Sequence, residues 1–214
     1  MEFKSWESIP RMSKEKVFVT EKIDGSNAAI RIRPFDINED RSSQLDTVSI
    51  DGEQFTVWAQ SRTRFLGPTK ETDNFGFGRW VYDNAPELVK ILGPGDHYGE
   101  WWGSKIQRGY GLTNGERKFS LFNASRWYEV LHHTESRSAV DGLLIVPTLY
   151  NGRFYDFDVK AVRDDLVQNG SKIVRGFKAE GMIVYLRELG KSYKVLLDND
   201  EIHKWQVDNE STVS

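Results

Sequence analysis

The chain has no cysteine among its 214 residues. This absence excludes disulfides, thiolate zinc sites and cysteine nucleophiles, and it fits a reducing compartment. No stretch approaches the roughly 18 apolar residues of a membrane-spanning helix, and the N-terminus lacks a basic region followed by an apolar one. We therefore expect a soluble monomer in the cytoplasm, the host's cytoplasm if the chain is viral, with no membrane partner.

The chain also lacks an excess of positive charge. Its 29 lysines and arginines face 32 aspartates and glutamates, which gives a net charge of -3. Bulk charge therefore does not predict nucleic-acid binding, and any site for a polyanion must be local. Two basic clusters could form such a site, although clusters of this kind are more often solvated surface. They comprise Lys105, Arg108, Arg117 and Lys118, and Lys172, Arg175 and Lys178.

Short apolar runs rich in Val, Ile and aromatic residues recur along the chain, and their lengths predict strands. They cover residues 17–20, 28–32, 55–59, 97–102, 119–122, 142–146, 182–186 and 193–197. Helices are predicted over residues 80–92, which a Gly-Pro-Gly sequence follows, and over residues 158–168, which an Asn-Gly pair follows. This mixture predicts an α+β fold with largely antiparallel sheets.

The polar segments predict how the chain is organised. Residues 36–54 are acidic and contain the turn signal Asp51-Gly52, so we expect an exposed hairpin or excursion between strands. Residues 206–214 form a polar tail that we expect to fray. The expected organisation is one domain over residues 1–205, followed by this tail.

The sharpest chemical feature is the segment TEKIDGSN at residues 20–27. A predicted strand runs into a turn here and places Lys22, Asp24 and Gly25 within four residues. Partial desolvation at the strand end, together with a nearby cation, would favour the neutral amine that can attack phosphorus. Taken alone, the same segment is as often an ordinary surface turn.

Five further segments follow in order along the chain. They are Ser61-Arg62, Tyr98-Gly99-Glu100-Trp101, Ser120-Leu121-Phe122-Asn123, Glu180-Gly181-Met182-Ile183-Val184 and Tyr193-Lys194-Val195. With the Lys-x-Asp-Gly turn, they resemble the collinear motifs of the covalent nucleotidyltransferases, which include DNA ligases, RNA ligases and capping guanylyltransferases. The nearest likeness is to RNA ligases of the phage T4 nick-sealing type, particularly small bacterial and phage members. The resemblance spans about residues 6–205 and implies a ligase adenylation domain whose antiparallel sheets flank a nucleotide cleft.

This resemblance implies a role for each matched residue. Lys22 would be the nucleophile that becomes linked to AMP, and Lys194 would contact phosphate and orient the triphosphate. Glu100 would accept hydrogen bonds from the ribose, Phe122 would stack on the purine, and Glu180 would also bind the metal. The complete set of implied nucleotide-binding residues is Glu21, Asp24, Gly25, Arg62, Glu100, Phe122, Glu180 and Lys194. Considered singly, Phe122 would be a core residue and Glu100 a salt-bridged acid.

The strand around Lys194 departs from the family pattern. The family has two lysines on alternate residues of this strand, whereas Ser192 and Leu196 flank Lys194 at those distances. Because side chains alternate along a strand, only one cation of this strand points into the site. Either ligation is less efficient, or Lys191 or Lys178 supplies the second charge.

A glycine-punctuated loop at residues 102–111 contains two cations and an aromatic residue. Lys105 and Arg108 could hold nucleic-acid phosphates there while the aromatic side chain stacks on a base. The alternative is that this tryptophan-rich segment is core.

The resemblance implies an ATP-dependent RNA ligase that uses Mg²⁺, with Mn²⁺ as an alternative, and joins 5′-phosphate to 3′-hydroxyl RNA ends. DNA ends are an alternative substrate. Twenty residues follow Lys194, so we expect a nearly bare catalytic domain without an appended OB-fold. The other interpretations are a minimal DNA nick ligase, a GTP-using capping-type guanylyltransferase and a degenerate nucleotide-binding module.

Overall fold

The computed structural model describes residues 2–6, 8–9, 11–38, 46–132 and 139–198. Its contacts divide the chain into two compact units. Unit 1 comprises Met1–Lys22 and Pro147–Ser214, and unit 2 comprises Ile23–Val146. The prediction of one domain over residues 1–205 did not include this division, and the predicted tail at residues 206–214 lies outside the described residues. In the described parts, no helix combines the length and apolarity needed to cross a membrane.

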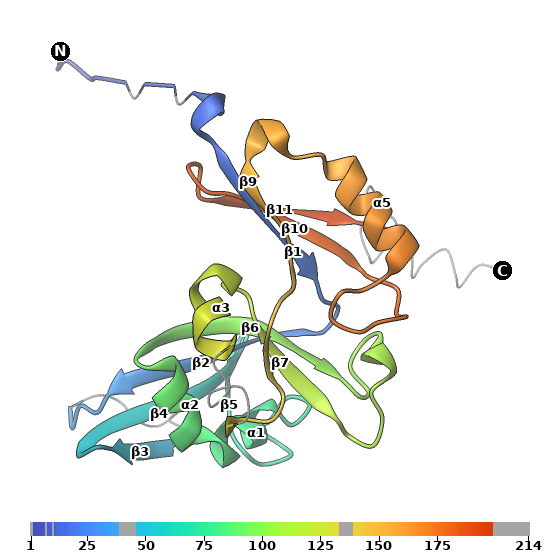
Figure 1. The fold of residues 1–214 in the computed structure, drawn as a ribbon. Coiled ribbons are helices and arrows are strands. Elements are labelled where there is room, and N and C mark those ends of the chain that lie inside the picture. The colour runs from blue at the N-terminus through green and yellow to red at the C-terminus, as the bar shows by residue number, and fades with distance from the viewer. Residues whose placement is uncertain (1, 7, 10, 39–45, 133–138, 199–214) are drawn as a thin grey trace, which may run out of the picture. The chain divides into compact units, whose positions relative to one another are not determined.

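Unit 1 is built on a four-stranded antiparallel sheet in the order β11-β10-β1-β9 (Figure 1). Its strands are β1 (Lys16–Lys22), β9 (Thr148–Arg153), β10 (Gly181–Leu186) and β11 (Lys191–Leu196), and its helices are η1 (Met12–Lys14), η3 (Phe154–Asp156) and α5 (Val159–Asn169). Alternate residues such as Val19, Met182 and Val184 form one apolar face with Leu166 of α5. The remaining side chains of each strand therefore point to the opposite face of the sheet.

Unit 2 contains a sheet in the order β3-β4-β2-β6-β7-β8, and β5 pairs with β4. Its elements are β2 (Ser26–Pro34), β3 (Asp46–Ile50), β4 (Glu53–Ser61), β5 (Phe65–Leu66), α1 (Phe77–Asp83), α2 (Ala85–Leu92), β6 (Gly95–Gly103), η2 (Gly109–Gly111), β7 (Arg117–Leu121), α3 (Ala124–His132) and β8 (Leu143–Ile145). Only β7 and β8 pair in parallel among the described strands. The structure thus confirms the predicted α+β fold with largely antiparallel sheets.

The core of unit 2 lies on one face of this sheet. Ile30, Trp101 and Phe119 from the strands pack with Leu88 of α2 and Trp127 of α3. Side chains at alternating positions point the other way, and we call this second face the Glu100 face after its central residue. Glu100, which is predicted to contact the ribose, lies on this face.

One local prediction needs correction. The predicted helix over residues 80–92 is two helices, α1 and α2, which are separated at Asn84. Asn84 has φ -112° and ψ 8°, and the proline in the first turn of α2 lacks the N–H that a continuous helix would need. Helix α3 and strand β9 were not predicted. The turn at Asp51-Gly52 is confirmed, because it joins β3 to β4.

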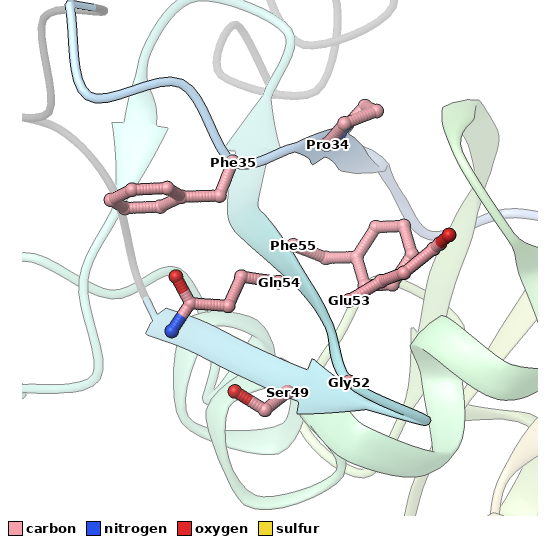
Figure 2. A pocket seen from close by; sticks show the side chains of 7 residues that line it. All are labelled: Pro34, Phe35, Ser49, Gly52, Glu53, Gln54 and Phe55. Atoms are coloured by element: carbon pink, nitrogen blue, oxygen red, sulfur yellow. The ribbon is translucent and has the colours of Figure 1, made fainter.

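A pocket at the β3–β4 hairpin lies away from the predicted site residues. Figure 2 shows its lining of Pro34, Phe35, Ser49, Gly52, Glu53, Gln54 and Phe55. None of the residues predicted to bind nucleotide is among them, so the pocket contributes nothing to the predicted site.

One glycine controls how closely β10 and β11 approach. A methyl group on Gly181 would lie 2.1 Å from the carbonyl oxygen of Val195 and 3.0 Å from Cα of Leu196. Because both obstacles are backbone atoms, a larger residue must push the strands apart.

We predict that Gly181→Ala destabilises the protein by about 1–3 kcal/mol, the usual cost of overpacking. Thermal unfolding should show a Tm lowered by several degrees. Ser192→Ala, at an exposed position of β11, is the matched control and should leave the Tm near that of the wild type. An unchanged Tm in Gly181→Ala would contradict the close approach.

Candidate active site

Lys22 is the last residue of β1, and its amine is held by a buried carboxylate. Its Nζ donates a hydrogen bond to Oε2 of Glu180 at 2.6 Å. The Glu180 side chain is 4% exposed and that of Lys22 is 25% exposed. The pairing of Lys22 with Gly181 brings Glu180, the residue before Gly181, to the end of β1. The structure therefore brings together two residues predicted from motifs 158 positions apart.

Lys194 lies on the same face of the unit 1 sheet as Lys22. It pairs with Ile183, which pairs with Thr20, and Thr20 is two residues before Lys22 on β1. Residues paired directly across strands share a face, and so do residues two apart on one strand. The sheet thus presents the amines of Lys22 and Lys194 from one side.

The structure argues against both candidates for a second cation. Lys191 lies three residues from Lys194 on β11, so its side chain leaves the opposite face of the sheet. Lys178 is engaged in an ion pair with Asp198, at 2.7 Å. Lys194 is therefore the lysine that β11 places on the Lys22 face.

The carboxylate of Glu21 is used inside unit 1. It accepts hydrogen bonds from Oγ of Ser171 at 2.5 Å and from the backbone nitrogens of Lys172 at 2.7 Å and Ile173 at 3.2 Å. Burial raises the pKa of the Glu21 carboxyl, and these hydrogen bonds partly offset the rise. Because neighbouring residues point to opposite faces of a strand, this carboxylate is directed away from the amine of Lys22. The geometry indicates an anchor for the loop after α5, and nucleotide binding by Glu21 stays a prediction.

In unit 2, Glu100 organises the turn that follows Lys22. Its Oε1 accepts a hydrogen bond from the backbone nitrogen of Gly25 at 3.1 Å, and its Oε2 accepts one from Nδ2 of Asn27 at 2.8 Å. A methyl group on Gly25 would lie 2.5 Å from the carbonyl oxygen of Trp101 and 2.9 Å from Cγ of Glu100. Glycine at position 25 is therefore required for the turn to approach β6.

Arg62 joins this group through Asn27. The exposed Arg62 guanidinium donates a hydrogen bond to Oδ1 of Asn27, which lies opposite Glu100 in the pairing of β2 with β6. Asn27 thus uses its amide to connect an arginine with a carboxylate. No role was predicted for Asn27. Its position in the same segment as Lys22, five residues later, could have indicated one.

Asp24 is held by the loop at residues 102–111. Its backbone nitrogen donates a hydrogen bond to the hydroxyl of Tyr110 at 2.9 Å, and its Oδ2 accepts one from Nε of Arg108 at 3.2 Å. Tyr110 is buried and packs edge-on against Trp102. Arg108, predicted to contact nucleic acid, is thus engaged with Asp24 in this structure, whereas Lys105 is exposed. The support from Tyr110 was not predicted.

Phe122 extends the Glu100 face beyond the end of β7. Its backbone nitrogen donates to the carbonyl oxygen of Tyr98 at 3.0 Å, which continues the β6–β7 pairing by one step. The ring is 41% exposed, so Phe122 is not the core residue that an isolated phenylalanine would be. An exposed aromatic ring beside Glu100 can stack on a base.

The carboxylate of Glu180 suits a divalent cation that is bound together with the phosphates of a substrate. Among the described residues, no group of three or more His, Asp or Glu side chains is arranged to hold a metal ion. Mg²⁺ is commonly held by one or two carboxylates together with substrate phosphates. Glu180 offers such a carboxylate, and an all-protein metal cage is not needed for that chemistry.

Comparison with known proteins identifies a matching family and matching folds. The RNA ligase family model matches residues 15–196. The Naegleria gruberi RNA ligase solved with pyrophosphate is similar in structure, with a TM-score of 0.56, 18% identity, and coverage of 86% of this chain and 50% of that one. A variant of that ligase solved with ATP and manganese gives a TM-score of 0.56 at 16% identity, covering 86% and 50%. Another variant, solved with AMP and manganese, gives 0.53 at 17% identity, covering 86% and 50%.

The chain spans about half the length of the solved ligases that it matches. A search of curated proteins gave no match. The particular likeness to the phage T4 type stays a prediction, but the family model covers most of the chain. The chain therefore belongs to the RNA ligase family.

Proposed function

We propose that this protein is an ATP-dependent RNA ligase in which Lys22 carries AMP between ATP and an RNA end. The observation that carries the proposal is the ion pair of Lys22 with the buried Glu180, directly before the turn that Glu100 organises. Membership of the RNA ligase family supports the reaction class. The Naegleria ligase structures with ATP, AMP, pyrophosphate and manganese support the choice of nucleotide and cation.

In the first step, Nζ of Lys22 attacks the α-phosphorus of ATP. A P–N bond forms, the bond from the α-phosphorus to the pyrophosphate oxygen breaks, and the amine loses a proton. Glu180, whose Oε2 is 2.6 Å from Nζ, would receive that proton or would hold the ammonium group of Lys22 before the reaction. The cationic Lys194 stabilises the triphosphate charge. A divalent cation at Glu180 would add further charge neutralisation.

Two displacements then seal the ends. An oxygen of the RNA 5′-phosphate attacks the AMP phosphorus, the P–N bond breaks, and Lys22 is released. The 3′-hydroxyl next attacks the activated 5′-phosphate, a phosphodiester forms, and AMP leaves. Glu100, Phe122 and Arg62 are assigned to hold the ribose, the base and the phosphate or ribose edge of the adenylate. DNA ends are an alternative acceptor in the same chemistry.

We predict that the purified protein incubated with α-labelled ATP and Mg²⁺ retains label after denaturation, whereas α-labelled GTP gives none. Lys22→Ala should lose labelling while keeping the circular dichroism spectrum of the wild type. The adenylated protein should then join RNA with 5′-phosphate and 3′-hydroxyl ends. Labelling of Lys22→Ala at the wild-type level would reject the nucleophile. Labelling by GTP would favour capping chemistry, and sealing of DNA alone would favour a nick ligase.

A second prediction uses the two faces of β11. Lys194→Ala should slow adenylation by about tenfold or more, the scale of a single charged interaction that stabilises the transition state. Lys191→Ala removes the same charge from the same strand but from the opposite face, so its rate should stay close to that of the wild type. Single-turnover labelling of Lys22 measures both. Equal effects of the two substitutions would show that the face of the strand does not matter.

A further inference from the structure

A row of exposed aromatic residues crosses the Glu100 face of unit 2. Strand pairing aligns Phe65 with Gln60, Gln60 with Ala29, and Ala29 with Tyr98. The backbone hydrogen bond from Phe122 to Tyr98 extends this alignment by one position. Residues paired directly across strands share a face, so all five side chains lie in one transverse row.

The aromatic members of the row are accessible. Tyr98 is 51% exposed, Phe122 41% and Phe65 40%. The helices of unit 2 do not cover these aromatic rings, because the apolar residues of the helices pack on the opposite, core face of the sheet. Large apolar side chains gathered on one surface indicate an interaction site more strongly than scattered ones do.

The row contains no charge, and its neighbours supply cations. Ala29 and Gln60 separate Tyr98 from Phe65, so no carboxylate stands between the two aromatic residues. The exposed Arg62 lies on one side of the row, two residues from Gln60. Arg31 lies on the other side, two residues from Ala29, with its guanidinium 5.9 Å from the centre of the Phe65 ring.

The carboxylates beside the row are already engaged. Asp96 accepts a hydrogen bond from Arg33 at 2.7 Å and lies 3.4 Å from Nε of Arg31, so one acid is shared by two guanidinium groups. Glu100 accepts its hydrogen bonds from Gly25 and Asn27. The region around the row therefore favours an anionic ligand that also offers flat apolar rings.

We propose that this row binds unpaired nucleotides of the RNA strand being joined. One base stacks on Tyr98 and another on Phe65, while Arg31 contacts a phosphate between them. Three strand spacings separate the two rings, roughly 14 Å, so they hold two different bases. Stacking on a protein ring requires a base whose face is not covered within a duplex. The site thus selects single-stranded RNA near the end that is sealed, an inference that rests on the proposed ligase function.

The test measures RNA affinity separately from adenylation. A fluorescent oligoribonucleotide that cannot base-pair is titrated with each protein at one fixed salt concentration, since phosphate contacts are salt-dependent. The same sequence in a continuous RNA duplex is titrated in parallel. Adenylation of Lys22 is measured without RNA on the same preparations.

We expect Tyr98→Ala and Phe65→Ala each to weaken single-strand binding about tenfold, within the range for removal of one base-stacking interaction. Tyr98→Phe keeps the ring and should bind like the wild type. Tyr128→Ala is the matched control, because Tyr128 is 55% exposed but lies on α3, on the core side of the sheet. Adenylation and duplex binding should change less than twofold in all four variants.

Three results would overturn the proposal. Unchanged single-strand affinity in both alanine variants would rule out the stacking interactions. A parallel loss of adenylation in Tyr98→Ala would assign that ring to the nucleotide site beside Phe122. An equal loss of duplex affinity would contradict selection of unpaired RNA. If the wild type formed no lysyl-AMP but its RNA binding still depended on both rings, the ligase function would fail and the RNA surface would stand.

Discussion

The pairing of β1 with β10 is the constraint on which the proposed chemistry depends. It ends where Lys22 faces Gly181, and so it places the buried carboxylate of Glu180 against the amine of Lys22. A buried carboxylate without a cation would be strongly unfavourable, so each group fixes the position of the other. Gly181 lets β11 approach from the other side, and β11 carries Lys194 to the same face. A slip of one residue in the pairing of β1 with β10 would place Lys22 and Lys194 on opposite faces of the sheet.

A second carboxylate organises unit 2 in a comparable way. Glu100 bonds to the backbone of Gly25 and the amide of Asn27, and Asn27 in turn receives Arg62. Tyr110 supports the same turn from the loop after β6. These contacts fix backbone and side chains before any ligand arrives, and such preorganisation lowers the cost of binding and catalysis. Glu100 therefore has a structural task in addition to the ribose contact assigned to it.

Much of this arrangement could be predicted from local sequence. Apolar runs with β-branched residues gave the central strands, since such residues suit a pleated, half-buried surface. The resemblance of the ordered motifs to those of the covalent nucleotidyltransferases indicated Lys22, Glu100 and Glu180. The break between α1 and α2 was missed, because the prediction used the Gly-Pro-Gly stop after residue 92 and did not weigh the proline in the first turn of α2, which favours a helix start there.

The remaining features depend on partners distant in sequence. The engagement of Glu21 requires Ser171, 150 residues away, and that of Asp24 requires Tyr110, 86 residues away. No local pattern encodes such pairs. The aromatic row is also a product of register, because Phe65, Tyr98 and Phe122 come from three separate strands or strand ends. Strand alternation, in contrast, was sufficient to limit β11 to one useful lysine, and the structure adds that Lys191 faces the other way.

Peptide mass mapping after brief reaction with ATP and Mg²⁺ tests whether Lys22 is the residue that carries AMP. The peptide containing Lys22 should gain the mass of one AMP, and fragmentation should place the adduct on Nζ of Lys22. The gain should disappear on addition of pyrophosphate, because the first step is reversible. An AMP adduct on another lysine, with Lys22 unmodified, would contradict the assignment of Lys22 as the nucleophile.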